Sequence, residues 1–311
     1  MFDPVVWFFV LGFVAGLARA DLRLPTAVYE LVSMVLLLAI GLKGGVELAR
    51  QPVAGLLPEI VLVIAIGVVL PLIVFPIARL VGRLAREDAA ALAAHYGSVS
   101  VGTFAVVVAY LATREIEYER QAPLWVVLLE VPAIIVGILL AQRRGAGTRW
   151  GPLLRELLLG RSIVLLVGGL AIGWLSGAGG LGGIDKLFFD LFKGVLALFL
   201  LEMGLIAAAE VGGLRRHGPF LIGFGVAMPC VAATLGAAVA WLLGLSPGGT
   251  IVLATLAASA SYIAAPAAFR TAVPRANPAL SLAASLAVTF PFNILVGIPL
   301  YERVIRSFLG P

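Results

Sequence analysis

The chain has 311 residues, of which 61% are hydrophobic and only 13% are charged, and its mean hydropathy is +1.09. A soluble domain needs a charged surface that this composition cannot supply, so the sequence excludes an aqueous globular protein and predicts an all-α polytopic membrane protein. The net charge of +5 does not indicate a nucleic-acid partner, because Lys and Arg accumulate in the cytoplasmic loops of membrane proteins. The single cysteine, Cys230, excludes an internal disulfide.

Apolar stretches bounded by Pro, Gly and charged residues predict ten transmembrane helices. They fall near residues 4–20, 26–43, 56–82, 88–113, 121–141, 153–176, 187–210, 219–244, 249–272 and 279–301. We expect the first to be a retained helix rather than a signal peptide, because Asp3 precedes it and no basic residue does. An even number of spans places both termini on the same side of the membrane.

The basic residues predict the orientation of these spans. With the N-terminus outside, 14 of the 22 Lys and Arg residues fall in inner connections: Arg19, Arg23, Arg79, Arg83, Arg86, Arg143, Arg144, Arg149, Arg155, Arg161, Arg215, Arg216, Arg270 and Arg275. The other 8 fall outside or are loosely assigned: Lys43, Arg50, Arg114, Arg120, Lys186, Lys193, Arg303 and Arg306. Because inner loops are enriched in basic residues, we expect both termini outside, in a cell inner (plasma) membrane.

The second half of the sequence repeats the first. Four pairs of residues recur at an offset of 161 or 163 positions: Gly41 with Gly204, Glu47 with Glu210, Ser98 with Ser259, and Ser100 with Ser261. This order predicts two five-span repeats, 1–141 and 153–311, joined by a short cytoplasmic linker at 142–152. Five spans per copy invert the second copy in the membrane, an arrangement typical of secondary transporters, with a duplicated scaffold that has no site as the alternative.

The predicted fourth and ninth spans each carry a cluster of small and polar residues halfway along, "GSVSVGT" from Gly97 and "SASYIAAP" from Ser259. Such clusters can simply let helices approach closely while hydroxyls bond to their own backbone. We favour interrupted helices, because the clusters occupy equivalent positions and contain Gly102 and Pro266. Two broken helices that cross at the midplane would direct their positive N-terminal ends at a common point, where peptide dipoles hold a small anion.

At these residues the chain resembles the sodium-dependent bicarbonate transporter family. The resemblance rests on "LPTAVYELVSMVLLLAIGLKGG", "GSVSVGT" with the later "EYE", "EVPA", and "RTAVPRANPALSLAASLAV" followed by "GIPLYE". It implies two inverted five-helix repeats, a core domain that moves against a scaffold domain as an elevator, a homotrimer in the membrane lipid, and Na⁺-coupled symport of bicarbonate. The family's anion and Na⁺ region falls on Gly97, Ser98, Ser100, Gly102, Thr103, Ser259 and Ser261, with Ser98, Thr103 and Ser261 as candidate Na⁺ ligands.

Tyr262 stands where the family carries an aspartate, and we include it among the candidate substrate-binding residues. A carrier for another small anion such as a carboxylate, coupled to H⁺ or uncoupled, is therefore the alternative. An enzyme is not expected, because the spans hold no clustered nucleophile, base or metal ligands, and Na⁺ is the only accessory ion predicted. The resemblance leaves a PII-like regulatory partner open, although the short basic linker is better explained as a positive-inside loop.

The remaining polar residues suggest more local roles. Glu130 is intramembrane and is a candidate for ion coupling, or else a buried anchor beside Pro132. Asp190 and Lys193 have the spacing of an ion pair on one helix face. We expect His95 and His217, near helix ends, to face water.

Overall fold

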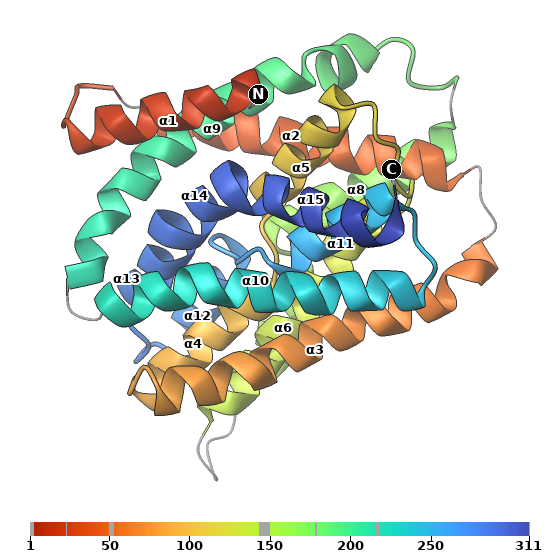
Figure 1. Cartoon of the computed structure of the whole chain (residues 1–311). Coiled ribbons are helices and arrows are strands. Elements are labelled where there is room, and N and C mark those ends of the chain that lie inside the picture. Colours follow the sequence, from red (N-terminus) through yellow and green to blue (C-terminus); the bar gives the residue numbers. More distant parts are fainter. Residues whose placement is uncertain are drawn as a thin grey trace.

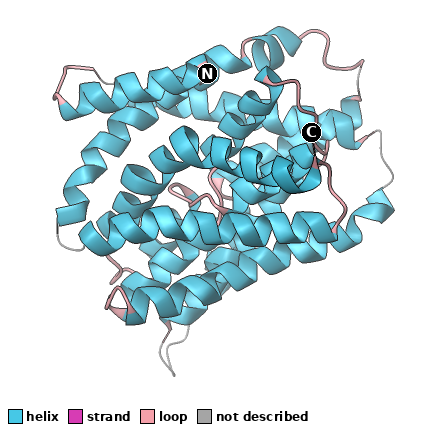
Figure 2. Ribbon diagram, viewed as in Figure 1, coloured by secondary structure: helices cyan, strands magenta, loops and turns pink. Residues whose placement is uncertain are grey.

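The computed structural model describes residues 3–22, 24–49, 53–142, 150–177, 179–215 and 218–310. Every regular element in these ranges is a helix, and no strand occurs among them (Figure 2). The predicted all-α class is therefore confirmed.

The first half contains six α-helices. They are α1 (Pro4–Leu17), α2 (Thr26–Leu48), α3 (Leu57–Leu80), α4 (Arg86–Gly97), α5 (Val101–Thr113) and α6 (Ala122–Ala141), with a 3₁₀ turn at Val53–Leu56. The Asp3 carboxylate accepts a hydrogen bond from the Val5 N–H at 3.0 Å and so caps the start of α1. Charged residues lie in the turn before α4, at Arg83, and in the loop between α5 and α6, at Arg114, Glu115, Glu117, Glu119 and Arg120.

The second half is more subdivided. It contains α7 (Trp150–Leu158), α8 (Arg161–Ser176), α9 (Phe192–Glu210), α10 (Gly218–Leu242), α11 (Pro247–Ala257) and α12 (Ala264–Ala272). A π-helical turn at Lys186–Asp190 precedes α9, and a 3₁₀ turn at Val211–Arg215 follows it. The last long helix consists of α13 (Pro278–Leu282), α14 (Phe290–Phe292) and α15 (Ile298–Leu309), joined by π-helical segments at Ala283–Thr289 and Asn293–Gly297.

The predicted sixth span is wrong in its first third. Residues 153–176 were expected to form one helix, but the chain breaks between α7 and α8 at Leu159 and Gly160. Leu153 and Leu157, one turn apart on α7, are buried in a small hydrophobic cluster that also contains Phe269 of α12. Helix α7 is therefore amphipathic and packs on α12. Residues 143–149 of the predicted linker lie outside the described residues.

Two helix pairs join the halves of the chain, and in both pairs glycines allow the backbones to touch. Helix α1 lies along α9, and α2 lies along α8 (Figure 1). A Cβ atom on Gly204 would lie 2.6 Å from the Phe13 nitrogen, and one on Gly169 would lie 3.0 Å from the Gly41 Cα. Small residues at such crossings give the close packing on which membrane helices depend. We call α1, α2, α8 and α9 the frame helices, and α3–α6 with α10–α15 the central helices.

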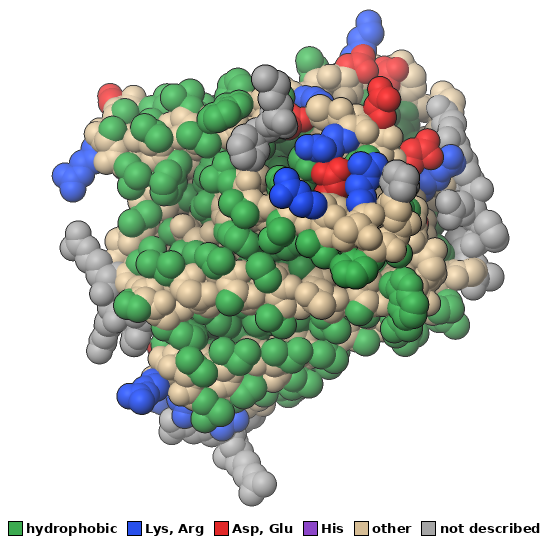
Figure 3. All heavy atoms as spheres, viewed as in Figure 1, with side chains coloured by type: hydrophobic (Ala, Val, Ile, Leu, Met, Phe, Trp, Pro, Cys, Tyr) green, Lys and Arg blue, Asp and Glu red, His purple; other side chains and the backbone are tan. Residues whose placement is uncertain are grey.

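The outer surface is apolar. Seven helices among the described residues are long and apolar enough to cross a membrane, and three shorter apolar helices accompany them: Pro4–Leu17, Arg161–Ser176 and Pro247–Ala257. Large apolar side chains remain exposed on these helices, among them Trp7, Leu11, Leu72, Leu80, Trp174, Leu175, Trp241 and Leu242. Figure 3 shows hydrophobic side chains over most of one face, with charged side chains gathered in a few groups. A surface of this extent requires lipid, so the chain is a multi-pass membrane protein.

Candidate functional site

Two non-helical stretches lie in the interior, surrounded by helices (Figure 2). Helix α4 ends at Gly97 and α5 begins at Val101, and Ser98 between them has extended backbone angles of φ −87° and ψ −175°. Helix α11 ends at Ala257 and α12 begins at Ala264, which leaves residues 258–263 between them. The predicted site serines all fall in these two stretches. Each of those serines is at most 2% exposed.

Hydrogen bonds join the two stretches directly. The Ser100 N–H donates to the Ser259 hydroxyl oxygen at 3.0 Å, and the Ser261 N–H donates to the His95 carbonyl at 2.8 Å. The His95 ring returns a second bond, since its Nδ1 lies 2.6 Å from the Ser261 carbonyl oxygen. A carbonyl can only accept, so Nδ1 carries the hydrogen. Residues about 160 positions apart are thus held as one buried unit.

The first turn of α5 presents backbone donors to this unit. Ser100 caps the helix, because its hydroxyl oxygen accepts from both the N–H and the hydroxyl of Thr103, each at 3.0 Å. The Val101 N–H forms no hydrogen bond with any described residue, and the Gly102 N–H lies beside the Tyr262 hydroxyl. Unpaired N–H groups and the helix dipole make such a turn attractive to an anion.

Two buried hydroxyls beside this turn have no partner of acceptable hydrogen-bond geometry among the described residues. They belong to Ser98 and Tyr262. The Tyr262 oxygen lies beside Ser100 and Gly102, where a Cβ atom on Gly102 would collide with it. Buried polar groups are normally satisfied, because leaving one unpaired costs about 1–3 kcal/mol. Two such groups at one helix N-terminus indicate a place where a ligand completes the hydrogen bonding.

Glycine is required at Gly97 for a packing reason. A Cβ atom there would collide with the Pro71 ring and lie 3.0 Å from the Ala133 side chain. The end of α4 is therefore pressed between α3 and α6. Gly97 thus fixes the position of Ser98 and is a packing residue in this structure.

The structure does not bring Glu130 into hydrogen-bond contact with the serines. Its side chain is 4% exposed on α6 and forms no hydrogen bond or ion pair with any described residue. Ala133, about one turn further along α6, contacts the Gly97 position, so the carboxyl lies near the end of α4. The predicted anchor beside Pro132 therefore lacks an anchoring partner among the described residues.

Several residues of the site were missed from the sequence. The Asn293 amide donates to the Ala258 carbonyl at 2.8 Å, and its oxygen accepts from the Tyr301 hydroxyl at 2.9 Å. Asn293 thereby supports the second interruption from the last helix. The sequence did contain a sign of this role, since an asparagine inside an apolar span is rare and usually has a buried hydrogen-bond partner.

Two predictions for single residues are wrong. His95 was expected to face water, but it is 1% exposed and bonded to Ser261. Lys193 was expected to pair with Asp190, but it lies 3.6 Å from the Asp3 carboxylate and donates to Thr113 at 2.9 Å. The three-residue spacing in the sequence favoured a pair between Asp190 and Lys193. In the folded chain, Asp3 at the start of α1 lies beside α9 and takes the place of Asp190. His217 lies outside the described residues.

The chemistry of the site is that of hydroxyl and peptide groups. No group of three or more His, Cys, Asp or Glu side chains suited to a metal ion occurs in the part of the chain that the structure describes. A small cation here would be held by oxygens such as those of Ser98, Thr103 and Ser261, and an anion by N–H and O–H donors. Both kinds of ligand suit ions that must also be released.

Comparison with known proteins places the sequence in a family. No curated protein matches it significantly. The profile that does match describes the Na⁺-dependent bicarbonate transporter superfamily, and it covers residues 4–306. That range includes both interruptions and all of the residues that join them. The chain belongs to the Na⁺-dependent bicarbonate transporter superfamily.

Proposed function

We propose that this chain carries bicarbonate into the cell together with Na⁺, and that the paired interruptions form its binding site. The observation that carries the proposal is the pair of unpartnered hydroxyls, Ser98 and Tyr262, beside the N-terminal turn of α5. Bicarbonate has oxygens that accept hydrogen bonds and one hydroxyl that donates. It would accept from the Val101 and Gly102 N–H groups and from the two hydroxyls. Membership of the superfamily supports this choice of anion.

Na⁺ would bind beside the anion, to oxygens of Ser98, Thr103 and Ser261. Importing one monovalent anion into a negative cell interior costs about 2.3 kcal/mol per 100 mV, and a cation that travels with it cancels this electrical term. Pairing also lowers the cost of holding either charge away from water. Glu130, buried nearby without a partner among the described residues, is the candidate residue for proton coupling in place of Na⁺.

The movement we propose is a displacement of the central helices against the frame helices. All of the site serines belong to the central helices, whereas α1, α2, α8 and α9 pair with one another. The two halves would be inverted repeats, with α4–α5 crossing α11–α12 at the midplane, so that the site opens alternately to each side. We further propose that the protein is a homotrimer in the inner (plasma) membrane, with both termini outside. A PII-like regulatory partner is a hypothesis that rests on the family resemblance alone.

Uptake by purified protein in liposomes tests the proposal. Labelled bicarbonate should accumulate in proportion to an imposed inward Na⁺ gradient, and replacing Na⁺ by K⁺ should abolish accumulation. The same vesicles given a proton gradient, or offered formate and acetate, test the alternative carrier. Faster uptake of a carboxylate, or equal uptake with and without Na⁺, would contradict the proposal.

A double variant ties the activity to the site. Ser98→Ala with Ser261→Ala removes two of the proposed ligand oxygens, so uptake should fall to the level of empty liposomes. Size-exclusion elution should stay unchanged, which shows that the assembly survives. Full uptake by this variant would place the binding site elsewhere.

A further inference from the structure

Two large cavities among the described residues are lined by equivalent faces of equivalent helices. One has a volume of about 810 Å³ and is lined on α2 by residues that include Ala39, Lys43 and Val46. The other has a volume of about 1190 Å³ and is lined on α9 by Glu202, Ile206 and Ala209. Each of these α9 residues lies 163 positions after its α2 counterpart, the offset that relates Gly41 to Gly204.

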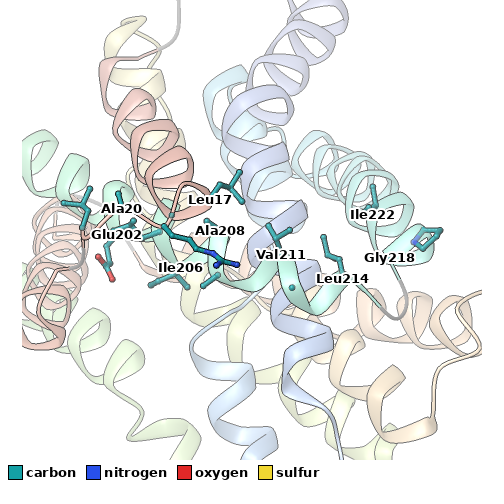
Figure 4. Close-up of a pocket in the computed structure, with 16 residues that line it drawn as sticks. Leu17, Ala20, Glu202, Ile206, Ala208, Val211, Leu214, Gly218 and Ile222 are labelled. Carbon is teal, nitrogen blue, oxygen red and sulfur yellow. The ribbon is translucent and has the colours of Figure 1, made fainter.

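Both cavities lie between frame helices and central helices, at different ends of the molecule. The first is closed by α5 and the loop after it, and the second by α10 and the end of α1. Figure 4 shows Leu17, Glu202 and Ile206 around the second cavity. In Figure 1 the chain after α1 turns at the left edge, whereas the loop between α5 and α6 lies toward the right. We call the first cavity, which Lys43 lines, the α5 cavity, and the second cavity, which Glu202 lines, the α1 cavity.

The α5 cavity extends from the surface toward the site. At its rim Arg120 pairs with Glu47 at 3.1 Å. Its lining also includes Phe104, a buried residue whose N–H bonds to the Ser100 carbonyl at 3.0 Å. Phe104 is therefore one helical turn from the N-cap of α5, so the lining of the cavity reaches to within one turn of the site.

Lys43 contributes a positive charge to the lining of this cavity. It lies four residues before Glu47 on α2, about 6 Å away along the helix axis, and its side chain is exposed. Its ammonium group forms no hydrogen bond or ion pair with any described residue. The other lining cations are neutralised, because Arg120 pairs with Glu47 and Lys193 with Asp3.

The loop after α5 adds acidic and phenolic groups to the lining of the cavity. Glu115 and Glu117 are exposed on the loop after α5. Burial and the nearby Glu47 charge raise the pKa of Tyr118 to about 12, so its phenol stays neutral. In the α1 cavity the position equivalent to Lys43 is Ile206, and its lining charges, Arg19 and Glu202, are of opposite sign. The lysine at this position is thus specific to the α5 cavity, whereas the α1 cavity carries Arg19, which also forms no ion pair with any described residue.

We propose that Lys43 forms a separate recruitment site, which holds a small monovalent anion in the α5 cavity before the anion passes Phe104. The proposal rests on the proposed function, because it supplies the path by which bicarbonate reaches the hydroxyls. A single cation in a cavity with low-dielectric walls raises the local concentration of anions. The equivalent position in the α1 cavity is Ile206, so the contribution of this lysine is confined to the side on which the α5 cavity opens.

Transport kinetics provide the first test. Lys43→Gln should raise the KM for bicarbonate about three- to tenfold with little change in maximal rate, and Lys43→Arg should restore the KM. Lys186→Gln, at an exposed lysine outside the cavity lining, is the matched control and should leave KM unchanged. An unchanged KM in Lys43→Gln, or an equal rise in Lys186→Gln, would overturn the proposal.

A labelling experiment reads the same charge without transport, so it remains informative if bicarbonate proves not to be the solute. Ala112→Cys places a thiol in the lining of the α5 cavity, in a Cys230→Ala background. In detergent, the ratio of its reaction rates with a sulfonate-bearing and a trimethylammonium-bearing thiosulfonate should fall about threefold or more when Lys43→Gln is added. A constant ratio would show that Lys43 does not set the potential of the cavity.

Discussion

Two serines two positions apart in the candidate site differ sharply in their bonding. Ser100 is fully engaged, since its N–H reaches Ser259 and its hydroxyl oxygen caps α5 through Thr103. Ser98 ends α4 with a buried hydroxyl that has no partner among the described residues. A structural role and a ligand role can therefore be separated by substitution.

Ser98→Ala should reduce transport without reducing stability. The change removes an unsatisfied buried hydroxyl, so the melting temperature in detergent should stay the same or rise. A hydrogen bond to a charged ligand contributes about 1.5–3 kcal/mol, so bicarbonate uptake should fall about tenfold or more. Uptake equal to that of the unaltered protein would remove Ser98 from the site.

Ser259→Ala is the matched comparison. It leaves the buried Ser100 N–H without an acceptor, so we expect a loss of about 1–3 kcal/mol of stability as well as a loss of uptake. The comparison is made by thermal unfolding of both variants in the same detergent. An undiminished melting temperature for Ser259→Ala would mean that the bond between the two stretches contributes little.

The sequence predicted the serines because their spacing repeats, but it could not reveal which of them bond to each other. His95 and Asn293 escaped prediction for a different reason. Neither is matched by a residue of its own type in the other half, and each gains its role from a partner far away, at Ser261 and at Ala258. Long-range hydrogen bonds of this kind leave no local periodicity.

Among the helices, α10 shows how a proline creates a binding group for its neighbour. Pro229 has no N–H, so the Gly225 carbonyl one turn earlier is free, and it accepts from the Thr289 hydroxyl at 2.7 Å. Since that hydroxyl hydrogen is used, the Tyr96 hydroxyl donates to Thr289, at 2.6 Å. Thr289 ends a π-helical segment and Asn293 begins the next. Such segments rotate polar side chains inward and are frequent at functional sites.

The bond from His95 to Ser261 should hold α4 to the second interruption. His95→Ala leaves the Ser261 carbonyl unsatisfied, and we expect a loss of about 1–3 kcal/mol in unfolding free energy. His95→Asn retains an N–H donor near the Nδ1 position and should recover much of the loss. Chemical unfolding in mixed micelles measures both, and equal stability of Ala and Asn variants would show that the hydrogen bond is not the stabilising feature.

Helix positions were predicted well where apolar runs end in charged or proline-containing turns, as at α3 and α6. They were predicted poorly where the pattern changes without a charge cluster. The break between α7 and α8 depends on Leu159 and Gly160, and the π-helical segments of the last helix leave the apolar run unbroken. Hydropathy measures burial in the membrane and is insensitive to the pitch of the backbone.

Across the whole molecule, helices and interrupted stretches of one half pack against those of the other half. The glycine faces of α1 and α2 contact α9 and α8, and the two interruptions exchange hydrogen bonds. The sequence repeat predicted two related halves. It could not predict that the frame helices pair between halves, because pairing within each half would give the same hydropathy profile.

Two separate fragments should therefore assemble. Cutting the chain between Gln142 and Trp150 leaves every described contact between the frame helices intact, so a tagged first fragment should co-purify with the second from membranes. Gly204→Leu in the second fragment is the control, since a side chain there would collide with α1. Independent purification of the two unaltered fragments, or unaffected pairing of the Gly204→Leu fragment, would contradict this interpretation.

The contact between Gly12 and Gly204 joins two helices that are synthesised at different times. At a ribosomal rate of 5–20 residues per second, α9 emerges roughly 10 to 40 s after α1. During that interval the glycine face of α1 is inserted in the bilayer without its permanent neighbour, and lipid or the insertion machinery must occupy the place that α9 later takes.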